Sequence, residues 1–301
     1  MINRPAPAAP PRSPEEALRA YAEVLAPTAI DAAHLDRVRA TVERACRGFG
    51  VTAVEPAGSR VRGTAIRAAE PLDLLVIAPR GDGWGECSRA AIAGLAAAAA
   101  ETMGVNTWDE RLGAFVELEP GPGLQLIPAA GRPSTSAARP EPPAAFEVRL
   151  PDGRGGWTDA TPRAHDLHLA AVASGSPTHL MTVRILRAWR ALRPAVEGLS
   201  AFAMELALAA CGGVGQAGRL TEAVQAALEA LAARLGGGQG VRDPLGLLPP
   251  IQLASPDGRA RLALEVERAQ RLAALAARAE AEGDLEEARL LWALAIGYAE
   301  Q

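Results

Sequence analysis

The sequence predicts an α+β protein of 301 residues whose first half mixes strands with helices and whose second half is helical. Two patterns indicate this division. Short apolar runs bounded by glycine and proline recur up to about residue 160, and segments with helical apolar spacing follow one another from Thr161 onward. We therefore expect a disordered tail over residues 1–12, an α/β core over 13–160 and a helical domain over 161–301.

The composition bounds the class of protein. Hydrophobic residues make up 49% of the chain and the net charge is −4, so we expect a sizeable core and no extended nucleic-acid surface. All 31 basic residues are arginine, which means that any phosphate contact would be made by a guanidinium fork. The three cysteines are far apart and no segment resembles a signal peptide or membrane span, so we expect a cytoplasmic protein without membrane contact.

Two helices are predicted before the first strand. Ser13, Pro14 and Glu16 have the order of a helix N-cap, a first-turn proline and a capping glutamate, and this helix should run to about Ala26. Asp31 should cap the second helix. Strands are then expected over residues 51–54, 72–77, 114–119, 124–128 and 146–150, with a helix over 86–103 and a Gly-rich turn over 152–157.

The strands expected over residues 114–119 and 124–128 should form an antiparallel hairpin, because Gly121-Pro122-Gly123 is a turn signal between them. In the second half, Thr161, Ser200 and Asp284 are expected as helix caps. Gly236 and Gly283 are expected as helix stops. The expected helices cover residues 162–174, 178–192, 199–211, 219–235, 259–282 and 285–299.

The stretch from Gly58 to Pro79 carries the strongest functional signal. A Gly-Ser pair opens a turn, a Gly-Thr pair follows, and Asp73 then enters an apolar strand. The backbone N–H groups and the hydroxyl of a Gly-Ser turn bind anions, typically a nucleotide phosphate. An isolated Gly-Ser pair is more often an ordinary turn, so the surrounding residues decide the interpretation.

This order of motifs resembles the signature of polymerase-β-like nucleotidyltransferases. Leu126-Ile127-Pro128-Ala129, the helix containing VRILRAWR (183–190), and Leu199-Ser200-Ala201-Phe202 with Glu205 resemble further segments of one branch. That branch is the cGAS/DncV-like nucleotidyltransferases (CD-NTases) of bacterial anti-phage defence, and the resemblance covers roughly residues 30–298. It implies a nucleotidyltransferase core with a C-terminal helical domain. It also implies nucleoside triphosphate binding by Gly58, Ser59, Arg62, Thr64, Arg187 and Ser200.

The acidic residues depart from the family pattern. The family's chemistry uses three carboxylates that hold two Mg²⁺ ions. Asp73 matches the second carboxylate, whereas Pro71 stands at the first position and Gln125 at the third. A proline has no ligand and a glutamine oxygen is neutral, so one carboxylate would face two divalent ions.

Two nearby glutamates offer an alternative. Glu70 and Glu117 would complete a rearranged trio with Asp73 if a bulge turned them toward it. We favour a catalytically impaired protein, a nucleotide-binding or protein-interaction module in bacterial anti-phage defence (CBASS), which needs no cofactor. The alternatives are an active enzyme that uses Mg²⁺ to make a cyclic or linear oligonucleotide from NTPs, and a structural scaffold with an empty pocket.

Overall fold

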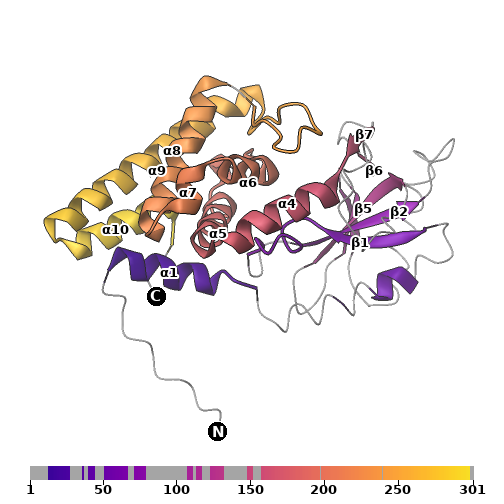
Figure 1. The fold of residues 1–301 in the computed structure, drawn as a ribbon, viewed down its shortest axis with the longest axis horizontal. Coiled ribbons are helices and arrows are strands. Elements are labelled where there is room, and N and C mark those ends of the chain that lie inside the picture. The colour runs from indigo at the N-terminus through magenta and orange to yellow at the C-terminus, as the bar shows by residue number, and fades with distance from the viewer. Residues whose placement is uncertain are drawn as a thin grey trace, which may run out of the picture. The chain divides into compact units, whose positions relative to one another are not determined.

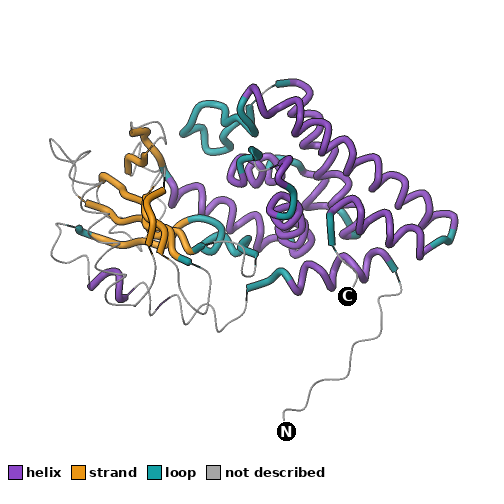
Figure 2. Tube along the Cα trace, turned by 180° about the vertical axis from the view of Figure 1, so that it is seen from behind, coloured by secondary structure: helices purple, strands orange, loops and turns teal. Residues whose placement is uncertain are grey.

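The structure is a computed structural model, and it groups the chain into two units. It describes residues 13–27, 36, 40–44, 51–66, 71–78, 107–110, 113–116, 123–131, 148–151, 157–196, 198–238 and 240–298. The first unit, here the sheet unit, comprises residues 26–175 and 242–250. The helical unit comprises residues 1–25, 176–241 and 251–301. In Figures 1 and 2, the labelled or orange strands all belong to the sheet unit.

The units are not the same segments as the predicted domains. Helix α1 (Pro14–Val24) groups with the helical unit, although it precedes the sheet in sequence. Helix α4 (Pro162–Gly175) groups with the sheet unit, where it contacts strand β1. The loop over residues 242–250 also belongs to the sheet unit. Each unit is therefore assembled from separate stretches of chain.

The described strands form one mixed sheet. Its main path runs β1 (Ala53–Ala57), β2 (Leu72–Ala78), β5 (Leu124–Gly131), β4 (Gly113–Val116) and β3 (Thr107–Glu110). β2 and β5 are parallel, and the other neighbours on this path are antiparallel. β6 (Val148–Pro151) pairs with the end of β5, and β7 (Trp157–Ala160) pairs with β6.

Most strand predictions are confirmed, including the antiparallel pairing of β4 with β5. The first strand extends to Ala57 rather than ending at residue 54, because β1 pairs with β2 along its whole length. Pro56 is tolerated there since β1 lies at the edge of the described sheet. The predicted turn over 152–157 is wrong at its end, where Trp157 begins β7. The predicted helix over 86–103 lies outside the described residues.

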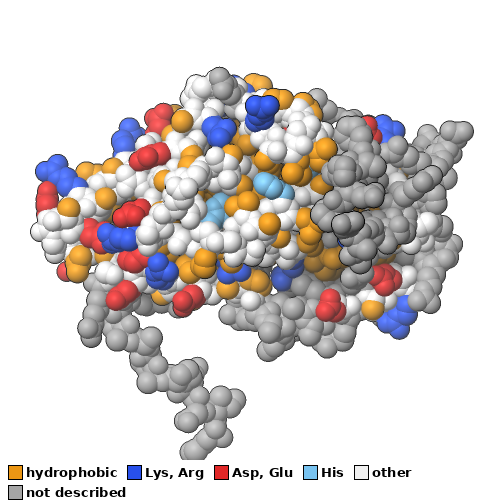
Figure 3. All heavy atoms as spheres, viewed as in Figure 1, with side chains coloured by type: hydrophobic (Ala, Val, Ile, Leu, Met, Phe, Trp, Pro, Cys, Tyr) orange, Lys and Arg blue, Asp and Glu red, His pale blue; other side chains and the backbone are white. Residues whose placement is uncertain are grey.

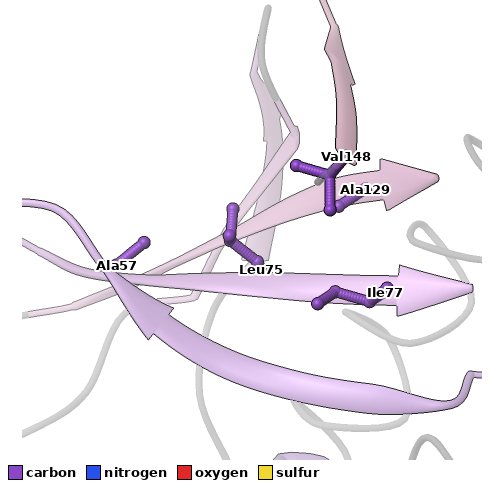
Figure 4. Packing of buried hydrophobic residues seen from close by; sticks show 5 residues of the cluster. All are labelled: Ala57, Leu75, Ile77, Ala129 and Val148. Carbon is purple, nitrogen blue, oxygen red and sulfur yellow. The ribbon is translucent and has the colours of Figure 1, made fainter. Parts of the chain in front are cut away.

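One face of the sheet places Asp73 at the border of a hydrophobic core. Side chains alternate along a strand, so Asp73 shares its face with Leu75 and Ile77. The latter two are buried with Ala57, Ala129 and Val148, which come from three other strands (Figure 4). Asp73 itself is only partly buried. Asp73 therefore lies at the edge of the buried apolar cluster, next to Leu75 on the same face.

The helical unit is built from long helices whose ends match their sequence signals. Ser13, Ser200 and Asp284 each accept a hydrogen bond from the N–H three residues later, which confirms these caps. Gly283 ends its helix with φ +87, as expected, whereas Gly236 lies inside a helix that ends at Gly237 and has Gly238 as its C-cap. The other elements are α5 (Pro177–Ala191), a 3₁₀ turn (Pro194–Val196), α6 (Ala201–Ala209), α7 (Gly212–Gln216), α8 (Leu220–Gly237), α9 (Pro256–Glu282) and α10 (Leu285–Ile296).

Helix α1 caps another helix of this unit. The residue before α8, Arg219, makes no side-chain cap bond. The carboxylate of Glu15 accepts hydrogen bonds from the N–H groups of Leu220 (3.0 Å) and Thr221 (3.1 Å) instead, and it pairs with Arg19 (2.7 Å). Burial alone would raise the pKa of Glu15, but these bonds and Arg19 outweigh burial and lower it. Glu15 therefore fixes the start of α8 from a distant part of the chain.

Among the described residues, no helix is both long enough and apolar enough to cross a bilayer. On the face drawn in Figure 3, basic and acidic side chains are interspersed over the region of α8, α9 and α10. Such mixing gives this part of the helical unit no field of a single sign.

We predict that Glu15→Gln lowers the free energy of unfolding by about 1–2 kcal/mol, because α8 loses its charged cap. The pKa of Glu15 is lower in the folded chain than in the unfolded chain. The contribution of Glu15 to the free energy of unfolding is therefore complete at pH 7. It is lost as the pH falls from about 4.3, the pKa in the unfolded chain, through the lower pKa in the folded chain. Urea denaturation at several pH values measures both effects. Glu23→Gln, on the exposed face of the same helix, is the matched control, and equal losses in the two variants would contradict the cap.

Candidate functional site

The predicted anion-binding turn is held by its own hydrogen bonds. The carbonyl of Ser59 accepts bonds from the N–H groups of Thr64 (2.9 Å) and Ala65 (3.1 Å), and the N–H of Arg62 donates to Gly58 O (3.2 Å). The Thr64 hydroxyl also donates to Ser59 O, at 3.4 Å. Ser59 and Thr64 are both buried. Residues 58–65, here the GS turn, therefore have a defined shape without any ligand.

Gly58 allows the GS turn to approach Asp73. Ala57, the residue before the turn, lies opposite Asp73 in the β1–β2 ladder. The φ angle of Gly58 is +75, and a Cβ added there would lie 2.1 Å from Asp73 Oδ2. Only glycine combines this backbone conformation with this close approach. The carboxylate predicted to act in catalysis thus lies against the backbone predicted to bind phosphate.

A residue that the sequence did not single out, Asp166 on α4, holds the turn from another side. Its Oδ2 accepts a hydrogen bond from the N–H of Gly58 (2.9 Å), and its Oδ1 pairs with Arg62 Nη1 (2.5 Å). Both side chains are buried. Arg62, predicted to contact nucleotide, therefore contributes one guanidinium nitrogen to a buried ion pair within the protein.

The sheet register shows which side chains share the face of Asp73. Gln125 on β5 lies directly opposite Asp73, and Phe115 on β4 lies directly opposite Gln125. Partners in a ladder project to the same face of a sheet. The row thus presents a carboxylate, a neutral amide and an aromatic ring. Pro71, two residues before Asp73, supplies no oxygen ligand from its side chain.

The ring of Phe115 extends toward the start of β5. A Cβ added at Gly123 would lie 2.2 Å from Phe115 Cζ and within 3 Å of two further ring carbons. Gly123 is two residues before Gln125, so the ring leans along the face on which a third carboxylate would stand. An apolar ring provides no ligand for a hard cation such as Mg²⁺.

The alternative acidic trio lies partly outside the described residues, because neither Glu70 nor Glu117 is among them. Within the described ranges, no three His, Cys, Asp or Glu side chains are grouped closely enough to hold a metal ion. The structure places Gln125 directly opposite Asp73 in the sheet.

The remaining predicted nucleotide contacts, Arg187 and Ser200, lie in the helical unit. Arg187 on α5 forms a buried ion pair with Glu205 on α6. Ser200 caps α6 by accepting a bond from the N–H of Ala203 (3.2 Å), and its own N–H donates to Leu253 O (2.8 Å). Both residues thus have structural partners, and their contact with nucleotide stays a prediction.

The residue next to Asp166, His165, anchors the loop over residues 242–250. His165 Nε2 lies 3.0 Å from Asp243 Oδ1, and its Nδ1 lies 3.0 Å from Thr161 O. Asp243 also accepts hydrogen bonds from the N–H groups of Leu245, Leu247 and Leu248. Burial alone would raise the pKa of Asp243, but the bonds from Leu245, Leu248 and His165 outweigh burial and lower it. Through this network His165 has a structural role in the sheet unit.

Comparison with solved structures decides the fold. No protein-family profile and no curated protein matches the sequence. The structure of CdnC from E. coli MS115-1 with ATP superposes with a TM-score of 0.74 at 16% identity, covering 95% of this chain and 98% of that one. The chain has the fold of the cGAS/DncV-like nucleotidyltransferases. CdnG from Bradyrhizobium diazoefficiens, in complex with GTP, gives a TM-score of 0.60 at 14% identity, covering 94% of this chain and 97% of that one.

The Vibrio cholerae cyclic AMP-GMP synthase DncV, with a linear intermediate, gives a TM-score of 0.64 at 16% identity. That match covers 83% of this chain and 70% of DncV. These matches confirm the predicted α+β class, with a nucleotidyltransferase core and helices in the C-terminal part. At such low identity they show the fold, and the reaction has to be argued from the side chains.

We predict that Gly58→Ala destabilises the protein more than Gly63→Ala does. Gly63 also has a positive φ, +73, but nothing lies within 4 Å of a Cβ added there. Gly63→Ala should therefore lower the free energy of unfolding by about 1–2 kcal/mol, the cost of placing a residue with a Cβ in a left-handed backbone conformation. Gly58→Ala should cost about 1–3 kcal/mol more, because the methyl group meets Asp73. Urea denaturation of both variants measures the difference, and equal losses would contradict the close approach.

We predict that His165→Phe lowers the free energy of unfolding by about 1–3 kcal/mol, because the buried Asp243 carboxylate loses one of its partners. Hydrogen exchange over residues 242–250 should rise in this variant. His168→Phe makes the same chemical change three residues later on the same helix and is the control. Unchanged exchange in the loop of His165→Phe would show that the backbone bonds to Asp243 hold the loop alone.

Proposed function

We propose that this chain is a CD-NTase-fold protein with impaired nucleotidyl transfer, which binds a nucleoside triphosphate as a cytoplasmic module of bacterial anti-phage defence. The observation that carries the proposal is the pairing of Asp73 with Gln125 across β2 and β5. A second ligand-bearing residue at this register position is what a two-metal site requires, and the position holds a neutral amide.

The chemistry explains why this exchange matters. Transfer of a nucleotidyl group in this fold relies on two divalent ions that stabilise the attacking and leaving oxygens. Mg²⁺ requires oxygen ligands in near-octahedral geometry and is usually bound through one or two carboxylates besides phosphate. The described residues on this face offer one carboxylate, Asp73, beside Gln125 and the ring of Phe115. These residues do not fit a pair of Mg²⁺ ions.

The GS turn supports retention of nucleotide binding. It keeps its glycines, the Ser59 and Thr64 hydroxyls and a shape defined by its own hydrogen bonds. Proteins with the same fold have been solved with ATP, in CdnC, and with GTP, in CdnG. CdnC has also been solved in a complex with a HORMA protein, and we extend a protein-partner role to this chain on that analogy alone.

The decisive experiment measures binding and turnover separately. The protein is titrated calorimetrically with ATP and GTP, with and without Mg²⁺, and is then incubated with labelled NTPs and Mg²⁺ or Mn²⁺. We expect saturable heat without metal and no pyrophosphate release that depends on Asp73. Ser59→Ala should weaken binding about tenfold, since a hydrogen bond to a charged phosphate is lost. Ser174→Ala, at an exposed serine of α4, is the matched control and should bind like the wild type.

Two outcomes contradict the proposal in different ways. Product or pyrophosphate release that disappears in Asp73→Ala would show an active enzyme with a rearranged acidic site. If no nucleotide gives a heat of binding, the chain acts as a structural scaffold with an empty pocket.

A further inference from the structure

Asp166 contacts two residues of the GS turn, Gly58 and Arg62, through one carboxylate. One oxygen accepts the N–H of Gly58, at the first residue of the turn, and the other pairs with the guanidinium of Arg62. The two contacts span 108 and 104 residues of sequence. A carboxylate that accepts a backbone N–H and an arginine donor forms two charge-assisted bonds, which are stronger and more directional than neutral ones.

The position of Asp166 shows that it acts from within the protein. Only 4% of Asp166 and 7% of Arg62 is exposed. Helix α4, which carries Asp166, contacts β1, the strand that leads into the turn. The carboxylate therefore belongs to the support of the turn, whereas a soluble ligand has to approach from the solvent side.

The contact with Gly58 also holds the start of the GS turn next to Asp73. Gly58 is held by Asp166 at its N–H, and its Cα lies against the Asp73 carboxylate. Ser59 follows directly in the chain, and its carbonyl closes the turn by accepting the N–H groups of Thr64 and Ala65. A displacement of Gly58 would thus move the Ser59 backbone and open the gap to Asp73.

We infer that Asp166 is a positioning residue for nucleotide binding, and that Arg62 serves it as a countercharge. This inference rests on the proposed function. Arg62 neutralises a carboxylate that would otherwise repel a phosphate close to the GS turn. The affinity of the turn for an anion then depends on the pair, although neither side chain has to touch the ligand.

The direction in which Asp166→Asn changes the affinity for ATP distinguishes a positioning role from a purely electrostatic effect. Removing a negative charge near an anion site, and releasing Arg62, would by itself tighten the binding of ATP. Loss of positioning weakens it. We expect Asp166→Asn and Arg62→Gln each to weaken ATP binding at least fivefold in calorimetry of the full chain. The double variant should bind no more weakly than the weaker single variant, because both changes break the same contact.

Glu15→Gln provides the control for a loss of stability. It removes a carboxylate from the helical unit and should lower the melting temperature while leaving the ATP affinity within twofold of the wild type. If Asp166 had only a structural role, Asp166→Asn would likewise lower the melting temperature and leave the ATP affinity unchanged. ATP binding by Asp166→Asn that equals or exceeds that of the wild type would overturn the inference.

Hydrogen exchange distinguishes failure of this inference from failure of the proposed function. In Asp166→Asn, amides over residues 58–65 should exchange at least tenfold faster, while those of α8 should not change. Unchanged exchange over residues 58–65 would overturn the inference even if the wild type binds ATP. If the wild type binds no nucleotide, the proposed function and the binding role of Asp166 both fail, and faster exchange would show only that Asp166 supports the turn.

Discussion

The two adjacent residues His165 and Asp166 on α4 hold the sheet unit together around its candidate site. Asp166 binds the turn that follows β1, and His165 binds Asp243 in a loop 78 residues further along the chain. Both contacts are buried, where an unpaired polar group is costly, so each makes its loop adopt one position. The close approach of Gly58 to Asp73 depends on this support together with the β1–β2 ladder, which places the preceding residue, Ala57, opposite Asp73.

The stability of the sheet does not depend on a group of carboxylates around Asp73. Stability of the sheet comes from the apolar face formed by Leu75, Ile77 and their neighbours and from the β2–β5 ladder. Carboxylates grouped at the border of that face repel one another in the absence of metal. The neutral Gln125 beside Asp73 adds no such repulsion and takes its place in the ladder. It also provides no negative charge for Mg²⁺.

Features set by local sequence were the predictable ones. The caps at Ser13, Ser200 and Asp284 follow from residues three positions apart, and the β4–β5 hairpin follows from its turn. The short strands β3 and β7 exist because neighbouring strands pair with them, and local propensity does not show this. In the candidate site, Asp73 and the GS turn were predictable from their motif. Asp166 was not, since an acidic residue inside a helix carries no sign of a partner 104 residues earlier.

The small bridge between Val241 and Ile251 has a consequence for how the protein is made. It joins the two residues that flank the loop over residues 242–250, and that loop belongs to the sheet unit. During synthesis the described strands therefore leave the ribosome before Asp243, the partner of His165, has been made. The sheet unit can reach its final form only after about residue 250 has been synthesised. For the same reason, a fragment that ends after α4 would be an unfinished unit rather than a separable domain.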